Sequence, residues 1–145
     1  MVKRLAWIFG IAGALIFAGL TAVLVSGESH VRVPAIAALV TFSSIVIAYL
    51  GGIEGGLALR ETAGDERSRA VTFFLSALPT LAAWGVLWLD SPQHQVAAAI
   101  AIFVLVWACD LWLARHGLVA AWFLDMRTAA TVLACAILGV ALWLL

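Results

Sequence analysis

The sequence predicts an all-α, polytopic membrane protein: a single domain, residues 1–145, folded as a compact bundle of five transmembrane helices. Hydrophobic residues make up 66% of the 145 residues and the mean hydropathy is +1.15, whereas a soluble domain is about 45–50% apolar. Charged residues are only 11% of the chain and gather between long apolar runs. Alternating strand patterns are absent, which excludes a porin-type barrel.

Five apolar runs are each close to the roughly 20 residues that cross a bilayer as a helix. Transmembrane helices are therefore expected at 5–25, 34–59, 70–89, 95–114 and 128–145. The first run is longer than the apolar core of a signal peptide, which has about 7–15 residues, so we expect it to be an uncleaved transmembrane helix. Pro34 is expected in the first turn of the second helix, where its missing N–H costs nothing.

A shorter apolar stretch, 118–124, follows Gly117, which is a natural helix break. The stretch is too short to span a bilayer. We expect an interfacial turn of helix there, or an extension of the fifth helix at the membrane surface.

The basic residues predict the orientation in the membrane. With the N-terminus on the cytoplasmic side, only Arg32 lies outside, and the others lie inside: Lys3, Arg4, Arg60, Arg67, Arg69, Arg115 and Arg127. Because cytoplasmic segments carry an excess of Lys and Arg, we predict a cytoplasmic N-terminus and a C-terminus on the outer side. The expected location is the cell inner (cytoplasmic) membrane, which the chain would cross several times.

The second helix carries a line of small residues, which we call the small-residue stripe. At 100° per residue one face collects Ala37, Thr41, Ser44, Ala48, Gly51 and Gly55, with Gly52 widening it. Small side chains let helices approach closely, and close approach drives helix association in lipid. The second helix is therefore predicted to be the helix around which the others pack.

Three ionisable residues are predicted to meet near the cytoplasmic ends of their helices. Glu54 stands beside the stripe, Asp110 lies four residues before the end of the fourth helix, and Arg127 opens the fifth. Charged residues in membrane segments usually face the bundle and find a partner. The favoured interpretation is an ion-paired clamp between helix ends. The alternative is a proton- or ion-handling site, or the polar end of a ligand pocket.

Other residues indicate structure more than chemistry. Pro79 is expected to kink the third helix. Cys109 and Cys135 fall inside apolar runs, where cysteine behaves as a small apolar residue. No catalytic motif and no Cys/His cluster is present, so we expect neither an enzyme nor a bound cofactor or metal. The formal net charge of zero argues against nucleic acid as a partner.

Three segments resemble one protein family in order along the chain. They are 50–59 (LGGIEGGLAL), 76–84 (SALPTLAAW), and a C-terminal pattern made by Asp110, 117–122 and 127–131. The sequence resembles the family known as domain of unknown function 3429, whose members include transmembrane protein 69. The resemblance implies a small bacterial or mitochondrial inner-membrane protein without an established biochemical function.

The chain departs from the family pattern at one place that bears on function. The pattern has His-Trp where this chain has Glu54 and Gly55. A role that rests on that histidine therefore does not transfer to this chain.

Three hypotheses for the function follow. The first is a structural or accessory bundle that binds a partner, with the lipid bilayer around it and a homo-oligomer or a larger membrane complex as its setting. The second is a proton- or ion-coupled transporter or channel that uses Glu54 and Asp110. The third is a membrane-embedded protein that binds a small ligand.

Overall fold

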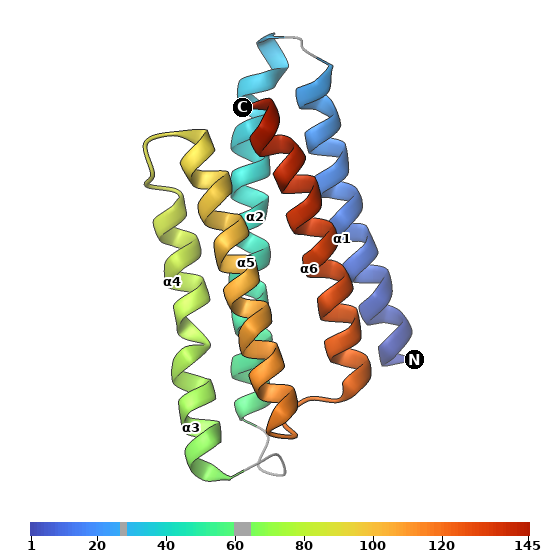
Figure 1. The fold of residues 1–145 in the computed structure, drawn as a ribbon, viewed down its shortest axis with the longest axis vertical. Helices are drawn as coiled ribbons and strands as arrows, with labels where there is room; N and C mark the ends of the chain where they lie inside the picture. The colour runs from blue at the N-terminus through green and yellow to red at the C-terminus, as the bar shows by residue number, and fades with distance from the viewer. Residues whose placement is uncertain (27–28, 60–64) are drawn as a thin grey trace.

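The computed structural model describes residues 1–26, 29–59 and 65–145, apart from the Ser29 side chain, and within these residues it contains no strand. The helices are α1 (Val2–Val25), α2 (Ser29–Ala58), α3 (Glu66–Leu75), α4 (Ala77–Val86), α5 (Pro92–Arg115) and α6 (Ala121–Leu144). Five spans are long and apolar enough to cross a membrane, and α3 and α4 together make the third. The predicted fold class, an all-α five-helix membrane bundle, is confirmed (Figure 1).

The two ends of the bundle are distinguished by the segments that lie there. Met1, the start of α3 and the turn between α5 and α6 lie at one end, which we call the N-terminal end (Figure 1). The C-terminus lies at the opposite, C-terminal end. Residues 60–64 of the predicted cytoplasmic loop, with Arg60, lie outside the described residues. Which side of the membrane the N-terminal end faces stays a prediction.

Helix α2 has the most helix neighbours. It packs against α1, α3, α4 and α5, whereas α6 packs against α1 and α5. Spans that are consecutive in the sequence run antiparallel and side by side, as short connections require (Figure 1). The bundle is therefore organised around α2.

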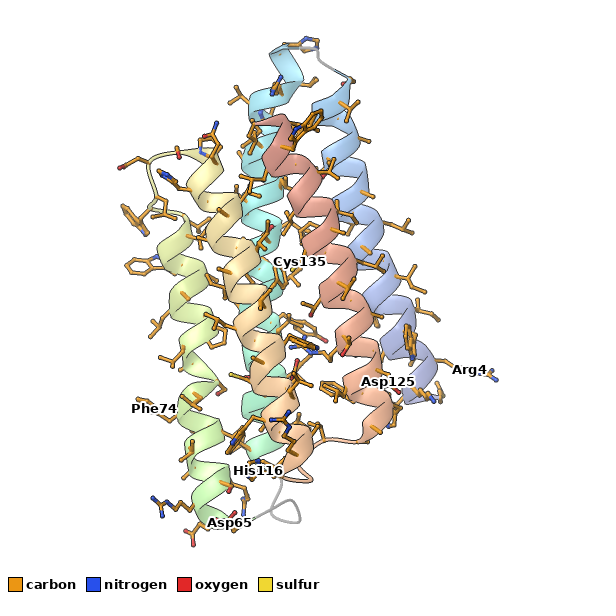
Figure 2. The ribbon with its side chains drawn as sticks, viewed as in Figure 1. Arg4, Asp65, Phe74, His116, Asp125 and Cys135 are labelled. Atoms are coloured by element: carbon orange, nitrogen blue, oxygen red, sulfur yellow. The ribbon has the colours of Figure 1, made fainter. Side chains whose placement is uncertain are left out.

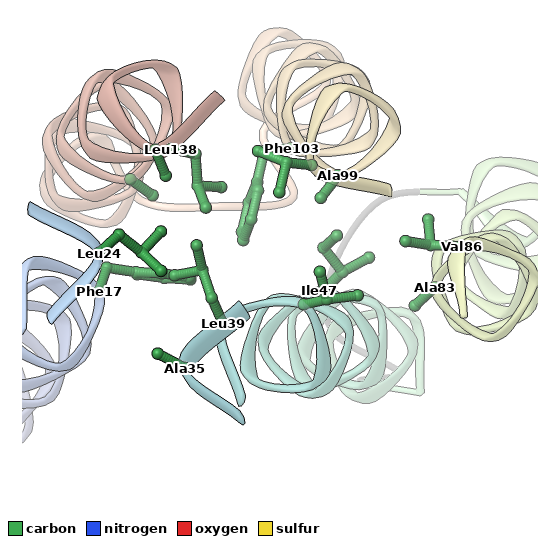
Figure 3. Packing of buried hydrophobic residues seen from close by; sticks show 14 residues of the cluster. Phe17, Leu24, Ala35, Leu39, Ile47, Ala83, Val86, Ala99, Phe103 and Leu138 are labelled. Atoms are coloured by element: carbon green, nitrogen blue, oxygen red, sulfur yellow. The ribbon is translucent and has the colours of Figure 1, made fainter. Parts of the chain in front are cut away.

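The apolar core fills the half of the bundle toward the C-terminal end. Helices α1, α2, α4, α5 and α6 all contribute to it (Figure 3), through residues that include Phe17, Leu24, Leu39, Ile47, Val86, Phe103 and Leu138. Phe17 stacks edge-on against Phe42 and Phe103, with ring centroids 4.9 and 6.1 Å apart. Toward the N-terminal end the buried positions include charged residues, Glu54, Asp110 and Arg127.

Local sequence signals fix both ends of α5. The Ser91 hydroxyl accepts the His94 N–H at 3.2 Å, and Pro92 occupies the first turn, as is usual at a helix start. At the other end Gly117 has a φ of 71°, and the Leu118 N–H donates to the Leu113 carbonyl at 3.0 Å. This arrangement is a Schellman motif. It needs the left-handed backbone that glycine adopts without strain.

The start of α3 is capped by an acidic residue and tied to α2. The Asp65 carboxylate accepts the Ser68 N–H at 3.2 Å, and the hydrogen bonds with Ser68 lower the pKa of Asp65 below its usual range. Arg69 donates from Nε to the Ala58 carbonyl at 3.1 Å. This bond satisfies one of the last carbonyls of α2, which have no partner within their own helix.

All five spans begin earlier than the sequence predicts, α2 and α6 by the largest margins. Helix α2 starts at Ser29, so Pro34 lies inside the helix and not in its first turn; near a helix start a proline removes only one backbone hydrogen bond. Helix α6 starts at Ala121, so residues 121–124 form its first turn and residues 118–120 precede the helix. The charged residues that follow do not interrupt the helix, because Arg127 turns inward and is buried.

The third span breaks where the proline predicts a kink. Helix α3 ends at Leu75, α4 starts at Ala77, and Ser76 lies between them. Pro79 has no N–H to give to the Leu75 carbonyl, and its ring crowds that carbonyl. The Ser76 hydroxyl donates to the Phe73 carbonyl at 2.7 Å, as serine does in bent helices.

Two glycines of α2 lie directly against the broken segment at Ser76. A Cβ added at Gly51 would lie 2.6 Å from the Ser76 carbonyl oxygen, and one added at Gly55 would lie 2.8 Å from the Ser76 hydroxyl. Gly51 and Gly55 therefore permit a close approach that a side chain would prevent.

The small-residue stripe packs inside the chain along only part of its length. Ser44, Gly51 and Gly55 are buried and Ala48 is half-buried, whereas Ala37, Thr41 and Gly52 are exposed. The deepest positions of α2 lie on the neighbouring line, which contains Ser43, Ile47 and Glu54. In the part of the chain that is described, the stripe thus contacts the third span, and Glu54 points into the bundle.

We predict that Gly51→Ala lowers the free energy of unfolding by about 1–3 kcal/mol, because the added methyl group meets a backbone carbonyl. Gly52→Ala is the matched control. Nothing lies within 4 Å of a Cβ added there, so the better helix propensity of alanine leaves stability unchanged or up to about 1 kcal/mol higher. Thermal unfolding of the two purified variants in one detergent measures the difference. Equal midpoints would contradict the close approach.

Candidate functional site

Three charged residues occupy positions that the apolar core would otherwise fill. On α5, Asp110 continues the buried line of Phe103 and Val106. On α6, Arg127 begins the buried line that leads through Thr131 to Leu138. Because these lines repeat at helical spacing, the charged side chains project into the same interior as the apolar ones.

The structure brings Glu54, Asp110 and Arg127 together. Arg127 Nε donates to Asp110 Oδ2 at 2.7 Å, and Arg127 Nη2 lies 4.0 Å from Glu54 Oε1. The exposed fractions are 2% for Glu54, 0% for Asp110 and 3% for Arg127. We call this group the charged cluster. It links α2, α5 and α6 at the depth where the sequence predicts the three residues to meet.

Further contacts hold the α5–α6 side of the cluster. The guanidinium carbon of Arg127 lies 5.9 Å from the centre of the Phe123 ring, within reach of a cation–π contact. One turn away, Trp107 Nε1 donates to the Thr128 hydroxyl at 2.9 Å, and that hydroxyl donates to the Leu124 carbonyl at 2.8 Å. Arg127 is therefore held by its own helix as well as by Asp110.

The two carboxylates are not equivalent. Asp110 accepts the short hydrogen bond through Oδ2, and only its Oδ1 is left without a hydrogen-bond partner; Glu54 Oε1 also has no partner, and no hydrogen bond to Glu54 is present among the described residues. The cluster contains two carboxylates and one guanidinium, so with every group ionised it carries one negative charge in excess. An uncompensated charge in an apolar interior costs several kcal/mol. Glu54 is thus the member of the cluster that is available to a further partner.

A cavity of about 290 Å³ opens beside Glu54, and we call it the Glu54 cavity. Helices α2, α3 and α5 line it, with Glu54, Val71, Thr72, Leu75, Cys109, Trp112 and Leu113. Most of these side chains are apolar, and Glu54 is the charged residue among them. A concave apolar site with a few polar groups is the usual form of a small-molecule site.

The wall of the cavity is fixed at the end of α5. The Trp112 ring packs on the His116 ring with centroids 4.1 Å apart, and His116 Nδ1 lies 2.8 Å from the Trp112 carbonyl oxygen. Figure 2 shows His116 and Asp65 at the N-terminal end of the bundle. The Glu54 cavity therefore lies close to this end.

Comparison with known proteins places the chain in a family. The sequence profile described as "Protein of unknown function (DUF3429)" matches residues 2–143. The chain belongs to this family. A search of curated proteins found no match, and neither did a search of solved structures. Within this DUF3429 member, no group of three or more His, Cys, Asp and Glu side chains among the described residues is placed to hold a metal ion.

Sequence reasoning on this DUF3429 member named the charged cluster, with the polar end of a ligand pocket as one alternative, but it did not name the other residues that line the cavity. Trp112 carries only the signal of a residue near a segment end, and Cys109 that of a small apolar residue. Val71 and Thr72 carry no sequence signal for a binding site. They lie on α3, before the break at Ser76, and their distance from Glu54 depends on how the break rotates α3 relative to α4. The remaining cysteine, Cys135, lines a different, apolar hollow between α5 and α6.

We predict that the three members of the charged cluster contribute unequally to stability. Arg127→Met leaves two buried carboxylates without a counter-charge and should lower the free energy of unfolding by about 3–5 kcal/mol. Glu54→Gln removes the excess negative charge, and no hydrogen bond to Oε1 is lost because none is present. It should therefore lower the free energy of unfolding much less. Thermal unfolding of the purified variants in detergent gives the order.

Arg115→Met is the matched control for Arg127→Met. Arg115 lies near the same end of the bundle but is exposed, and exposed charges contribute little to stability. If Arg127→Met and Arg115→Met unfold at the same temperature, the charged cluster does not hold the helices together.

Proposed function

We propose that this DUF3429 member is a membrane-embedded small-ligand-binding protein whose binding site is the Glu54 cavity. One observation carries the proposal: Glu54, whose side chain is almost wholly buried and whose Oε1 has no hydrogen-bond partner in the described structure, lines a cavity. A buried polar atom without a partner is costly. A ligand that donates a hydrogen bond to Glu54 would remove this cost.

The size and lining of the cavity support the same function. Its volume, about 290 Å³, lies at the lower end of the roughly 300–1,000 Å³ typical of ligand pockets. Val71, Leu75 and Leu113 offer apolar contacts, and Glu54 and Thr72 offer the few polar groups that orient a ligand. A small molecule with one polar end fits this pattern.

The other two hypotheses explain less of the site. A transporter that uses both carboxylates needs Asp110 to exchange its partner, but Asp110 is 0% exposed and hydrogen-bonded to Arg127. A purely structural role explains the bond between Asp110 and Arg127. It gives no reason for a cavity beside Glu54, whose Oε1 has no hydrogen-bond partner in the described structure. Ligand binding accounts for both carboxylates, with Asp110 holding the helices and Glu54 facing the ligand.

The proposal predicts that a small molecule stays with the protein when it is extracted from membranes. Native mass spectrometry of the detergent-released protein should show a bound small molecule in the wild type and much less in Val71→Trp. Val71 is 42% exposed at the edge of the cavity, so an indole there can fill the cavity without breaking the core.

Val140→Trp is the matched control. Val140 is 51% exposed on α6 and does not line the Glu54 cavity, so the same substitution should leave the bound molecule in place. Equal loss in Val71→Trp and Val140→Trp, or a wild type that carries no small molecule, would contradict ligand binding at this site.

A further inference from the structure

We infer that the Glu54 cavity takes a monocationic organic ammonium ion with a small apolar body. This inference names the ligand class of the site and rests on the function proposed above. Three independent features of the cavity carry it: the charge of the cluster behind it, the hydrogen-bonding character of its oxygen atoms, and the apolar and aromatic side chains of its wall.

The charge of the cluster favours a single positive charge. Glu54 and Asp110 face one guanidinium, with Arg127 4.0 Å from Glu54 and hydrogen-bonded to Asp110. One further positive charge would make the group neutral. An anion would meet the excess negative charge directly, and a dication would reverse its sign. Because the surroundings are apolar, screening is weak and the sign of the ligand matters strongly.

The oxygen atoms in the lining are acceptors. An ionised Glu54 carboxylate can only accept hydrogen bonds. The Thr72 hydroxyl already donates to the Ser68 carbonyl at 2.8 Å, so towards a ligand it can act only as an acceptor. A ligand that pairs with both oxygens must therefore bring donors. An ammonium group offers up to three N–H donors and no acceptor.

The remaining wall suits an apolar body next to a cation. Val71, Leu75 and Leu113 are aliphatic, and the Trp112 indole is held by its contact with His116. Indole is the aromatic ring that attracts cations most strongly. The volume of about 290 Å³ limits the ligand to a small molecule. A phospholipid or a peptide is too large to be enclosed there.

The test uses three probes that share one ring and differ in charge: benzylammonium, benzyl alcohol and benzoate. Each is titrated calorimetrically into the full chain purified in one detergent. Val71→Trp serves as the blank for partition into the micelle, and Val140→Trp as the matched control. We expect benzylammonium to bind to the wild type and to Val140→Trp, with benzyl alcohol weaker and benzoate not binding.

Removing the negative charge should affect the cation alone. Glu54→Gln should weaken the binding of benzylammonium by about tenfold or more, since a hydrogen bond between two charged groups is stronger than one to a neutral amide. Its effect on benzyl alcohol should be small. Thr72→Val removes the second acceptor and should also weaken benzylammonium more than benzyl alcohol. Thr131→Val, at a buried threonine outside the cavity, should change neither.

The outcomes separate this inference from the proposed function. If benzyl alcohol or benzoate binds as tightly as benzylammonium and Val71→Trp abolishes that binding, the cavity is a ligand site but the charge assignment is wrong. If no probe binds more tightly to the wild type than to Val71→Trp, the proposed function and the inference both fail. Should Glu54→Gln not fold, the order of the probes in the wild type and the Thr72→Val result still decide.

Discussion

The guanidinium of Arg127, held between the carboxylates of Asp110 and Glu54, is the interaction on which the arrangement of α2, α5 and α6 depends. Apolar helix faces in lipid carry little information about register, because lipid tails are as apolar as leucine. A buried ion group is different, since one turn of sliding moves a side chain by 5.4 Å and separates the charges. The distances of 2.7 and 4.0 Å therefore fix the axial positions of the three helices.

A second constraint sets the position of the third span. Pro79 breaks the span at Ser76, and Gly51 and Gly55 let the break lie directly against α2. Helix α3 lies on the side of the break that faces the N-terminal end of the bundle, and its Thr72 side chain is buried. The Glu54 cavity lies where α3 and α5 both face α2. Leu75, which precedes the break, and Glu54 of the charged cluster both line it.

Stability alone does not account for the charged cluster. Well-packed apolar residues of similar volume commonly stabilise a fold as well as a buried ion group does. Asp110 and Arg127 offset part of their desolvation through a short hydrogen bond, but the Arg127 guanidinium lies 4.0 Å from Glu54. A residue that weakens a fold and faces a cavity fits the common conflict between stability and function at binding sites.

The sequence by itself determined the five spans, the break near Pro79 and the depth of Glu54, Asp110 and Arg127, because polarity, helical period and proline chemistry are local properties. The rotation of each helix about its axis was decided by the tertiary structure. A lipid-facing and a core-facing side chain are equally apolar, so the sequence could not tell that Ile47 is buried while Thr41 is exposed. The same helix rotations place Glu54 at the wall of a cavity and Asp110 against Arg127. These rotations depend on contacts between segments far apart in the chain, which the sequence alone does not show.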